Sequence, residues 1–119
     1  MGIENLQKKY AEFKDTRNWE KFHEPKNIAM SISIEASELM EHFQWKDNVP
    51  IEKIKQDEEL MAGVREELAD VILYSLSMAQ RMDIDIEEAV LKKLDENRER
   101  FDEETAEEIE QELSEWRKE

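Results

Sequence analysis

The chain carries two acidic runs, EASELMEHFQW at residues 35–45 and REELAD at residues 65–70. Glu35 and Glu38 are three residues apart in the first run, and Glu67 and Asp70 are three apart in the second. Residues at i and i+3 lie on the same face of a helix, with Cβ atoms roughly 5–6 Å apart. If both runs are helical, each therefore presents a pair of carboxylates on one side. The residues between the runs are numerous enough for one helix to end and a second to return antiparallel to it.

Two such pairs facing each other would bring four carboxylates together. Like charges at short range repel and raise one another's pKa, so the group needs a cation to balance it. Hard divalent ions with oxygen ligands suit carboxylates best. The two runs therefore predict a divalent metal site.

Composition favours one all-α domain. The chain has 119 residues, the length of a single domain. Two glycines and two prolines supply little turn material for a many-stranded sheet. The absence of cysteine excludes disulfides, a thiolate nucleophile and cysteine-based zinc sites. No apolar run approaches the roughly 18 residues of a membrane span, and MGIENLQKKY lacks the apolar core of a signal peptide. We expect a cytoplasmic protein that does not bind membranes.

The net charge of −15 makes nucleic acid an unfavourable partner. Binding to a duplex depends on lysine and arginine neutralising phosphates, and the sequence has no basic patch. A ligand that carries phosphates would need metal ions to cancel part of the repulsion.

Apolar residues at three- and four-residue steps predict a first helix over about residues 3–14. The segment from Trp19 to His23 then breaks the periodicity and is rich in aromatic side chains, which either plug the end of a bundle or form a wall for a flat ligand. Pro25 suits the first turn of a second helix, expected to end near Trp45.

A third helix is expected from about Ile51 or Asp57 to Met82. Its apolar arc beyond Val64 is too wide for one partner helix, which indicates burial against another subunit. A fourth helix is expected over about 86–101, with Asp85 as its cap and an apolar core stripe that includes Val90 and Leu94. A capping box of Thr105 and Glu108 would begin a fifth helix, or a partly ordered tail.

The motif ExxE followed by ExxD is weak by itself in a chain with 32 acidic residues. Its context is specific: RNWEKFHEPKN, EASELMEHFQW, EELADVILY and KKLDENRERF occur in that order. The chain thereby resembles the MazG-type nucleotide pyrophosphohydrolases of the all-α NTP pyrophosphatase superfamily, and most of all the dCTP pyrophosphatase branch. The resemblance covers about residues 6–101. It implies a four-helix-bundle-like MazG domain over 1–101 in a homodimer or homotetramer, with 102–119 as an extra acidic C-terminal helix or tail.

The resemblance also implies an activity, the Mg²⁺-dependent hydrolysis of (deoxy)nucleoside triphosphates to the monophosphate and pyrophosphate in nucleotide-pool sanitation, with Mn²⁺ as a substitute metal. It assigns Glu35, Glu38, Glu67 and Asp70 as metal ligands. Lys93 and Asn97 would reach the phosphates. The nucleotide pocket would be lined by Tyr10, Trp19, Glu20, Lys21, Phe22, His23, Trp45 and Tyr74. The dCTP-specific enzymes have histidine where this chain has Tyr10, so a preference for cytosine is not implied.

The chemistry is attack by water on the α-phosphorus, for which metal ions stabilise charge on the phosphate oxygens. Glu38 or Glu41 would accept the proton from water, and the sequence does not rank them. Lys93 would neutralise phosphate charge.

Two other classes are compatible with acidic helices. A di-iron bundle typically needs two Glu-x-x-His motifs, and the chain has one, Glu20/His23, in a predicted loop. A catalytically inactive acidic helical adaptor would simply keep its carboxylates in solvent.

Overall fold

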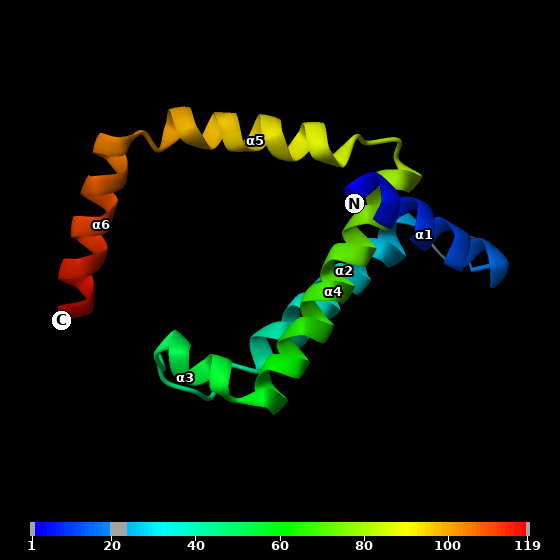
Figure 1. The fold of residues 1–119 in the computed structure, drawn as a ribbon. Helices are drawn as coiled ribbons and strands as arrows, with labels where there is room; N and C mark the ends of the chain where they lie inside the picture. The colour runs from blue at the N-terminus through cyan, green and yellow to red at the C-terminus, as the bar shows by residue number, and fades with distance from the viewer. Residues whose placement is uncertain (1, 20–23, 119) are drawn as a thin grey trace. The chain divides into compact units, whose positions relative to one another are not determined.

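The computed structural model describes residues 2–19 and 24–118, and every regular element within these ranges is a helix (Figure 1). The all-α prediction is confirmed. The chain divides into two compact units, Met1–Ile84 and Asp85–Glu119. The helices are α1 (Ile3–Thr16), α2 (Pro25–Glu41), α3 (Ile51–Gln56), α4 (Glu58–Arg81), α5 (Ile86–Arg100) and α6 (Glu103–Lys118).

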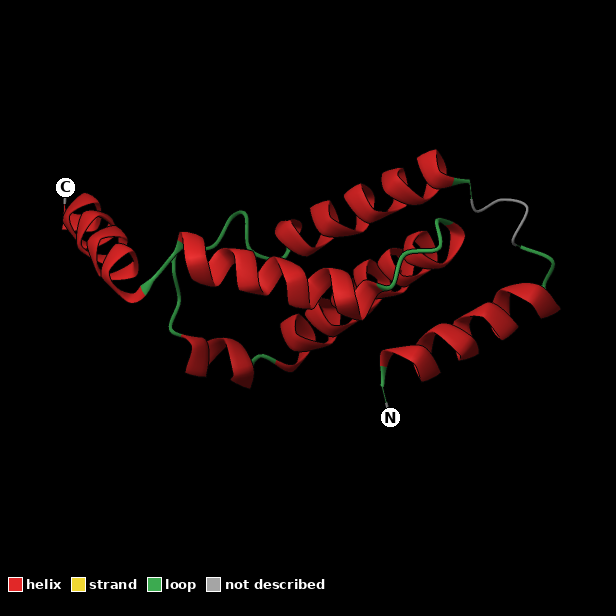
Figure 2. Cartoon of the chain, turned by 90° about the horizontal axis from the view of Figure 1, so that it is seen from above, coloured by secondary structure: helices red, strands yellow, loops and turns green. Residues whose placement is uncertain are grey.

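Helix α4 is the central element of the first unit, because α1, α2 and α3 each pack against it. The longest of these contacts is with α2, which runs beside α4 (Figure 2). Among the residues that the structure describes, the buried apolar side chains are Ile28 of α2 and three residues of α4, namely Leu60, Leu76 and Ala79. This small core fixes the face of α2 that meets α4, and it thereby positions the acidic residues of both helices.

Aspartate side chains determine where three helices begin. Asp57 Oδ1 accepts a hydrogen bond from the Leu60 amide at 3.1 Å. Helix α4 therefore starts at Glu58, in agreement with the predicted start at about Asp57, and the segment from Ile51 forms the separate helix α3. Asp85 caps α5 in the same way, as predicted. The capping box predicted at Thr105 and Glu108 is wrong, because Asp102 Oδ1 accepts from the Thr105 amide at 2.8 Å and α6 begins three residues earlier than that box requires. That hydrogen bond also lowers the pKa of Asp102.

The second helix is shorter than predicted. It ends at Glu41, and residues 42–45 form a turn in which the amides of Phe43 and Gln44 both bond to the Met40 carbonyl. The Phe43 bond reaches three residues back, as in a 3₁₀ turn, and such tightening is frequent where an α-helix ends. Trp45 follows with 88% of its surface exposed.

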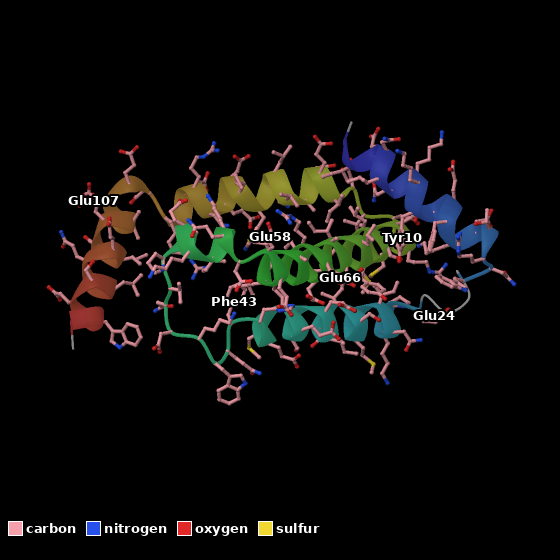
Figure 3. All side chains as sticks on the ribbon, turned by 60° about the horizontal axis from the view of Figure 1, so that its bottom comes forward. Tyr10, Glu24, Phe43, Glu58, Glu66 and Glu107 are labelled. Atoms are coloured by element: carbon pink, nitrogen blue, oxygen red, sulfur yellow. The ribbon has the colours of Figure 1, made fainter. Side chains whose placement is uncertain are left out.

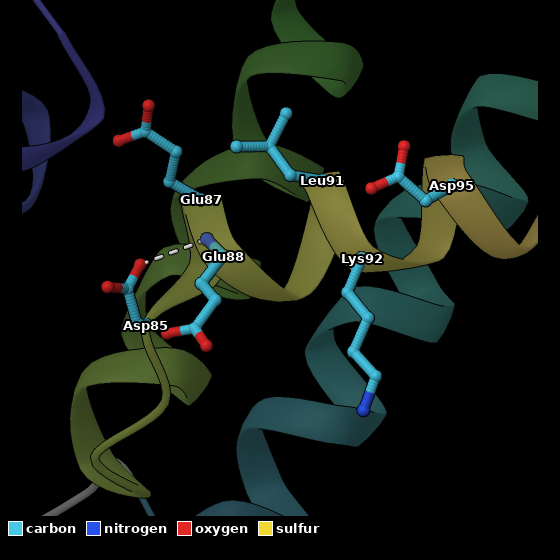
Figure 4. Close-up of a pocket in the computed structure, with 6 residues that line it drawn as sticks. All are labelled: Asp85, Glu87, Glu88, Leu91, Lys92 and Asp95. Atoms are coloured by element: carbon cyan, nitrogen blue, oxygen red, sulfur yellow. Dashed lines mark hydrogen bonds between the residues drawn. The ribbon is translucent and has the colours of Figure 1, made fainter.

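The second unit consists of α5 and α6, joined through Phe101 and Asp102. Within the second unit, Val90 and Leu94 of the core stripe predicted for α5 are about half exposed. One face of α5 bears a surface depression of about 470 Å³ lined by Asp85, Glu87, Glu88, Leu91, Lys92 and Asp95 (Figure 4). All six belong to α5 or its cap, so the depression follows the grooves of a single helix.

Membrane crossing requires a long, strongly apolar helix, and the described parts of the chain contain none.

Candidate metal and nucleotide site

Helices α2 and α4 bring three carboxylates together. Glu35 and Glu38 of α2 and Glu67 of α4 each offer an oxygen, and these three oxygens lie within 4.8 Å of one another. The pair on α2 shares a face because of its three-residue spacing. The packing of that face against α4 then adds Glu67. We call these three side chains, each half-buried, the carboxylate cluster.

Asp70 lies three residues beyond Glu67 on α4, close enough for its charge to act on Glu35. The pKa of Glu35 is raised to about 7, first because burial removes water from its carboxyl group. A hydrogen bond with Glu38 and the charges of Glu38, Asp70 and Glu67 add to the effect. All four predicted metal ligands therefore belong to one neighbourhood, with Asp70 at the margin of the cluster.

The surroundings of Glu35 Oε2 indicate whether this neighbourhood suits a cation. It is buried and has no hydrogen-bond partner. A buried polar atom without a partner is rare because it loses water without compensation. If Glu35 is protonated it can donate to Glu38, and if it is ionised the oxygen needs a positive partner. The donor set is all oxygen, as Mg²⁺ prefers.

His42 and Gly63, which were not among the predicted site residues, lie next to Glu67 or on its helix. The His42 Nε2 atom lies 2.6 Å from Glu67 Oε2, and the imidazole ring rests above Gly63 of α4. Sequence offered a signal for both. His42 falls four residues after Glu38, and Gly63 interrupts a segment otherwise rich in helix formers four residues before Glu67.

Helix α1 packs against α4 and brings an aromatic and a basic side chain to it. The Tyr10 ring is half-buried, and its pKa is raised by burial and then by the charges of Tyr74 and Asp70. Tyr10 and Tyr74 thus lie near the acidic neighbourhood, and Figure 3 shows Tyr10 on α1. Their place in a nucleotide pocket stays a prediction. Lys14 is fully buried, donates from Nζ to Ser77 Oγ at 2.9 Å, and lies 4.9 Å from the Tyr10 ring centroid. Sequence reasoning missed Lys14, because a lysine on an amphipathic helix is usually assigned to solvent.

The predicted aromatic wall is only partly described. Trp19 packs edge-on against Phe13, with ring centroids 5.5 Å apart, and keeps 45% of its surface exposed. Trp45 projects from the turn after α2. Four further residues predicted to line the pocket lie outside the described residues: Glu20, Lys21, Phe22 and His23.

Glu41, a candidate proton acceptor, is exposed at the end of α2 and does not belong to the carboxylate cluster. It lines a surface cavity of about 400 Å³ together with His42, Lys46, Asp57, Glu59 and Leu60. Glu38, the other candidate, is a member of the cluster. The structure thus separates the two candidates.

Lys93 and Asn97 lie on α5 in the second unit. Both are exposed, and Lys93 Nζ is 3.8 Å from Glu96 Oε2 in a surface ion pair. Their expected contact with phosphates stays a prediction.

The MazG-like family model matches residues 30–116, from within α2 to within α6. The chain belongs to the MazG-like family. Rat and human dCTP pyrophosphatase 1 are each 40% identical to this MazG-like chain over 100 residues, which are 83% of the chain. The chain spans only 58% of the length of these relatives.

A solved structure also resembles the MazG-like chain. The crystal structure of a pyrophosphatase from Archaeoglobus fulgidus is 40% identical to it, with a TM-score of 0.74. The match covers 85% of this chain and 93% of the archaeal one. The predicted MazG-type fold and the resemblance to the dCTP pyrophosphatase branch are thereby confirmed.

Proposed function

We propose that this MazG-like chain hydrolyses nucleoside triphosphates to the monophosphate and pyrophosphate. The observation that carries the proposal is the carboxylate cluster, which contains a buried oxygen without a partner. The names of the relatives, dCTP pyrophosphatase and pyrophosphatase, support a pyrophosphohydrolase.

Glu35, Glu38, Glu67 and Asp70 would hold Mg²⁺, with Mn²⁺ as a substitute. A bound divalent ion of this kind supplies charge neutralisation at phosphate oxygens and acidifies a bound water. The four side chains would hold the ion where α2 and α4 meet. Their half-burial limits the screening of the charges by solvent, which strengthens their attraction for a cation.

The proton of the attacking water needs an acceptor, and Glu38 and Glu41 are the two candidates. Glu38 lies within the carboxylate cluster, so the same side chain would also be needed to hold the ion. Glu41 lies outside the cluster, so that its carboxylate is not committed to a metal. Replacing each by glutamine separates the roles, since loss of a base lowers kcat without loss of metal affinity, whereas loss of a ligand lowers both.

The base of the nucleotide would stack on aromatic side chains. The hydroxyl groups of Tyr10 and Tyr74 would form hydrogen bonds with the polar edge of the base. Stacking is worth about 1–3 kcal/mol per base and tolerates many bases. Discrimination among bases therefore falls to polar atoms near Asp70, such as the Tyr10 hydroxyl. The remaining proposed contacts follow the family resemblance: Trp19, Glu20, Lys21, Phe22, His23 and Trp45 at the nucleoside, and Lys93 and Asn97 at the phosphates.

We also propose a homodimer or homotetramer that acts in cytoplasmic nucleotide-pool sanitation. About half of the surface of four apolar side chains on α2 and α4 is exposed in the single chain, namely Met30, Ile34, Leu68 and Ile72. Apolar surface of this kind on a helix pair favours burial against another subunit.

The test is a panel of canonical and modified triphosphates, assayed with Mg²⁺ and then with EDTA. We expect pyrophosphate as the first product, no turnover in EDTA, and no turnover by Glu38→Gln. The matched control is Glu66→Gln, which removes an exposed charge from α4 next to Glu67 (Figure 3). Release of orthophosphate as the first product would rule out attack at the α-phosphorus.

A further inference from the structure

We propose that His42 is a positioning residue for the metal site, and that Gly63 provides the space it needs to hold Glu67. This inference rests on the proposed function, because the proposed function includes a metal ion that the Glu67 carboxylate would bind. His42 itself lies outside the carboxylate cluster.

The first observation is the hydrogen bond. The Nε2 atom of His42 lies 2.6 Å from Oε2 of Glu67, just below the usual range of about 2.7–2.9 Å for a charge-assisted hydrogen bond from nitrogen to a carboxylate. It joins the turn after α2 to the middle of α4, across 25 residues of sequence. The Glu67 side chain is only 14% exposed and that of His42 is 31% exposed, so water competes weakly for this contact.

The second observation is the space above Gly63. A Cβ atom at this position would lie 2.8 Å from Nε2 and 3.1 Å from Nδ1 of His42, and it would come closest to Cε1. The ring thus rests on the helix backbone itself. Alanine stabilises a helix interior relative to glycine, so glycine here is at odds with local propensity and is explained by the room it leaves for the imidazole.

Together the two residues fix the orientation of a flexible ligand. A glutamate side chain has three rotatable bonds, and Glu67 must bring an oxygen to within 4.8 Å of those of Glu35 and Glu38. The hydrogen bond between His42 Nε2 and Glu67 Oε2 restricts the carboxylate to one orientation. Residues that orient metal ligands in this way typically change metal affinity by about 10–100-fold.

The test measures Mn²⁺ binding by electron paramagnetic resonance of the free ion, without nucleotide, on the full chain. His42→Met introduces an apolar side chain of similar length that has no hydrogen-bond donor. We expect this variant to weaken Mn²⁺ binding by about 10–100-fold. His42→Gln can still donate to Glu67, and we expect it to recover most of the affinity. Circular dichroism checks that each variant is folded.

Gly63→Ala is an independent test, because the methyl group of alanine would displace the imidazole ring of His42. We expect Gly63→Ala to weaken Mn²⁺ binding when His42 is present, and to cause no further loss in the His42→Met background. A folded His42→Met variant with wild-type affinity would overturn the proposal. Equal losses from Gly63→Ala in both backgrounds would also overturn it, because the effect would then not pass through the ring.

The outcome also separates this inference from the proposed function. Tight Mn²⁺ binding that depends on His42, in a chain that hydrolyses no triphosphate, would remove the proposed function and support the positioning role. Triphosphate hydrolysis together with Mn²⁺ binding that is indifferent to His42 would do the reverse.

Discussion

Replacing Glu35 by glutamine should stabilise the metal-free protein above neutral pH and weaken its response to magnesium. Glutamine keeps the size of the side chain and removes its charge from the carboxylate cluster. The pKa of Glu35 is raised in the folded chain from 4.5 to about 7. A raised carboxyl pKa means that the folded state holds a proton which the unfolded state has already released, so ionisation of this group opposes folding.

The size of the effect follows from the geometry. Two unit charges 4.8 Å apart, the upper limit for the three oxygens, repel by about 0.9 kcal/mol in water and about 3.5 kcal/mol at an effective dielectric constant of about 20. The carboxylates are half-buried, and salt screens them further, so the lower part of this range applies. Removing one charge that faces two others should therefore stabilise the metal-free chain by about 1–2 kcal/mol at about pH 8.

The assay is urea denaturation in EDTA, followed by circular dichroism at several pH values. Wild-type Glu35 is protonated in both states at about pH 4 or below, so the advantage of Glu35→Gln should vanish there. It should grow as the pH rises from 4.5 to about 7, as wild type loses stability, and stay constant above. The control is Glu66→Gln, which removes an exposed charge from α4 and should change the free energy of unfolding little. A gain that is equal at low and high pH, or absent at high pH, would refute the mutual repulsion.

Three further predictions test other parts of the structure. Mg²⁺ at ten times its Kd should stabilise wild type by about 1.4 kcal/mol and Glu35→Gln by less; equal shifts in thermal melts would argue against Glu35 as a ligand. Ser77→Ala leaves the buried Lys14 ammonium without this acceptor and should cost about 1–3 kcal/mol by urea denaturation, whereas Ser75→Ala, whose hydroxyl bonds to a carbonyl of its own helix, should cost less. Trp45→Ala should leave stability within about 0.5 kcal/mol because the ring is exposed, and should raise the Kd for a nucleotide, measured by calorimetry; an unfolded variant would contradict this.

The parts of the site that the sequence predicts are those set by local periodicity. The spacings of Glu35 with Glu38 and of Glu67 with Asp70 place each pair on one helix face, whatever the helix packs against. The apolar stripes then indicate that these faces meet. Their convergence in the structure needs only that α2 and α4 pack side by side, as they do.

The parts that the sequence does not predict depend on contacts between distant segments. Lys14 is buried because α1 lies across α4 at Ser77, 63 residues away. His42 reaches Glu67, 25 residues away, because α2 packs beside α4, and this pairing of helices is not written in either segment alone. Helix starts were ambiguous for a simpler reason: Asp102 and Thr105 are both good caps, and the structure uses the first.

The same cluster that makes the chain a candidate enzyme also works against its folding. The net charge is −15, and the carboxylate cluster holds three acidic oxygens within 4.8 Å of one another. Among the described residues, the one ion pair between a basic side chain and a cluster member is that of His42 with Glu67. The metal-free chain must therefore offset most of the repulsion with its small core around Ile28, Leu76 and Ala79. A divalent ion at the cluster would turn repulsion into attraction on the two helices that form the core. Metal binding and folding of the first unit should therefore be coupled, so that EDTA lowers stability and activity together.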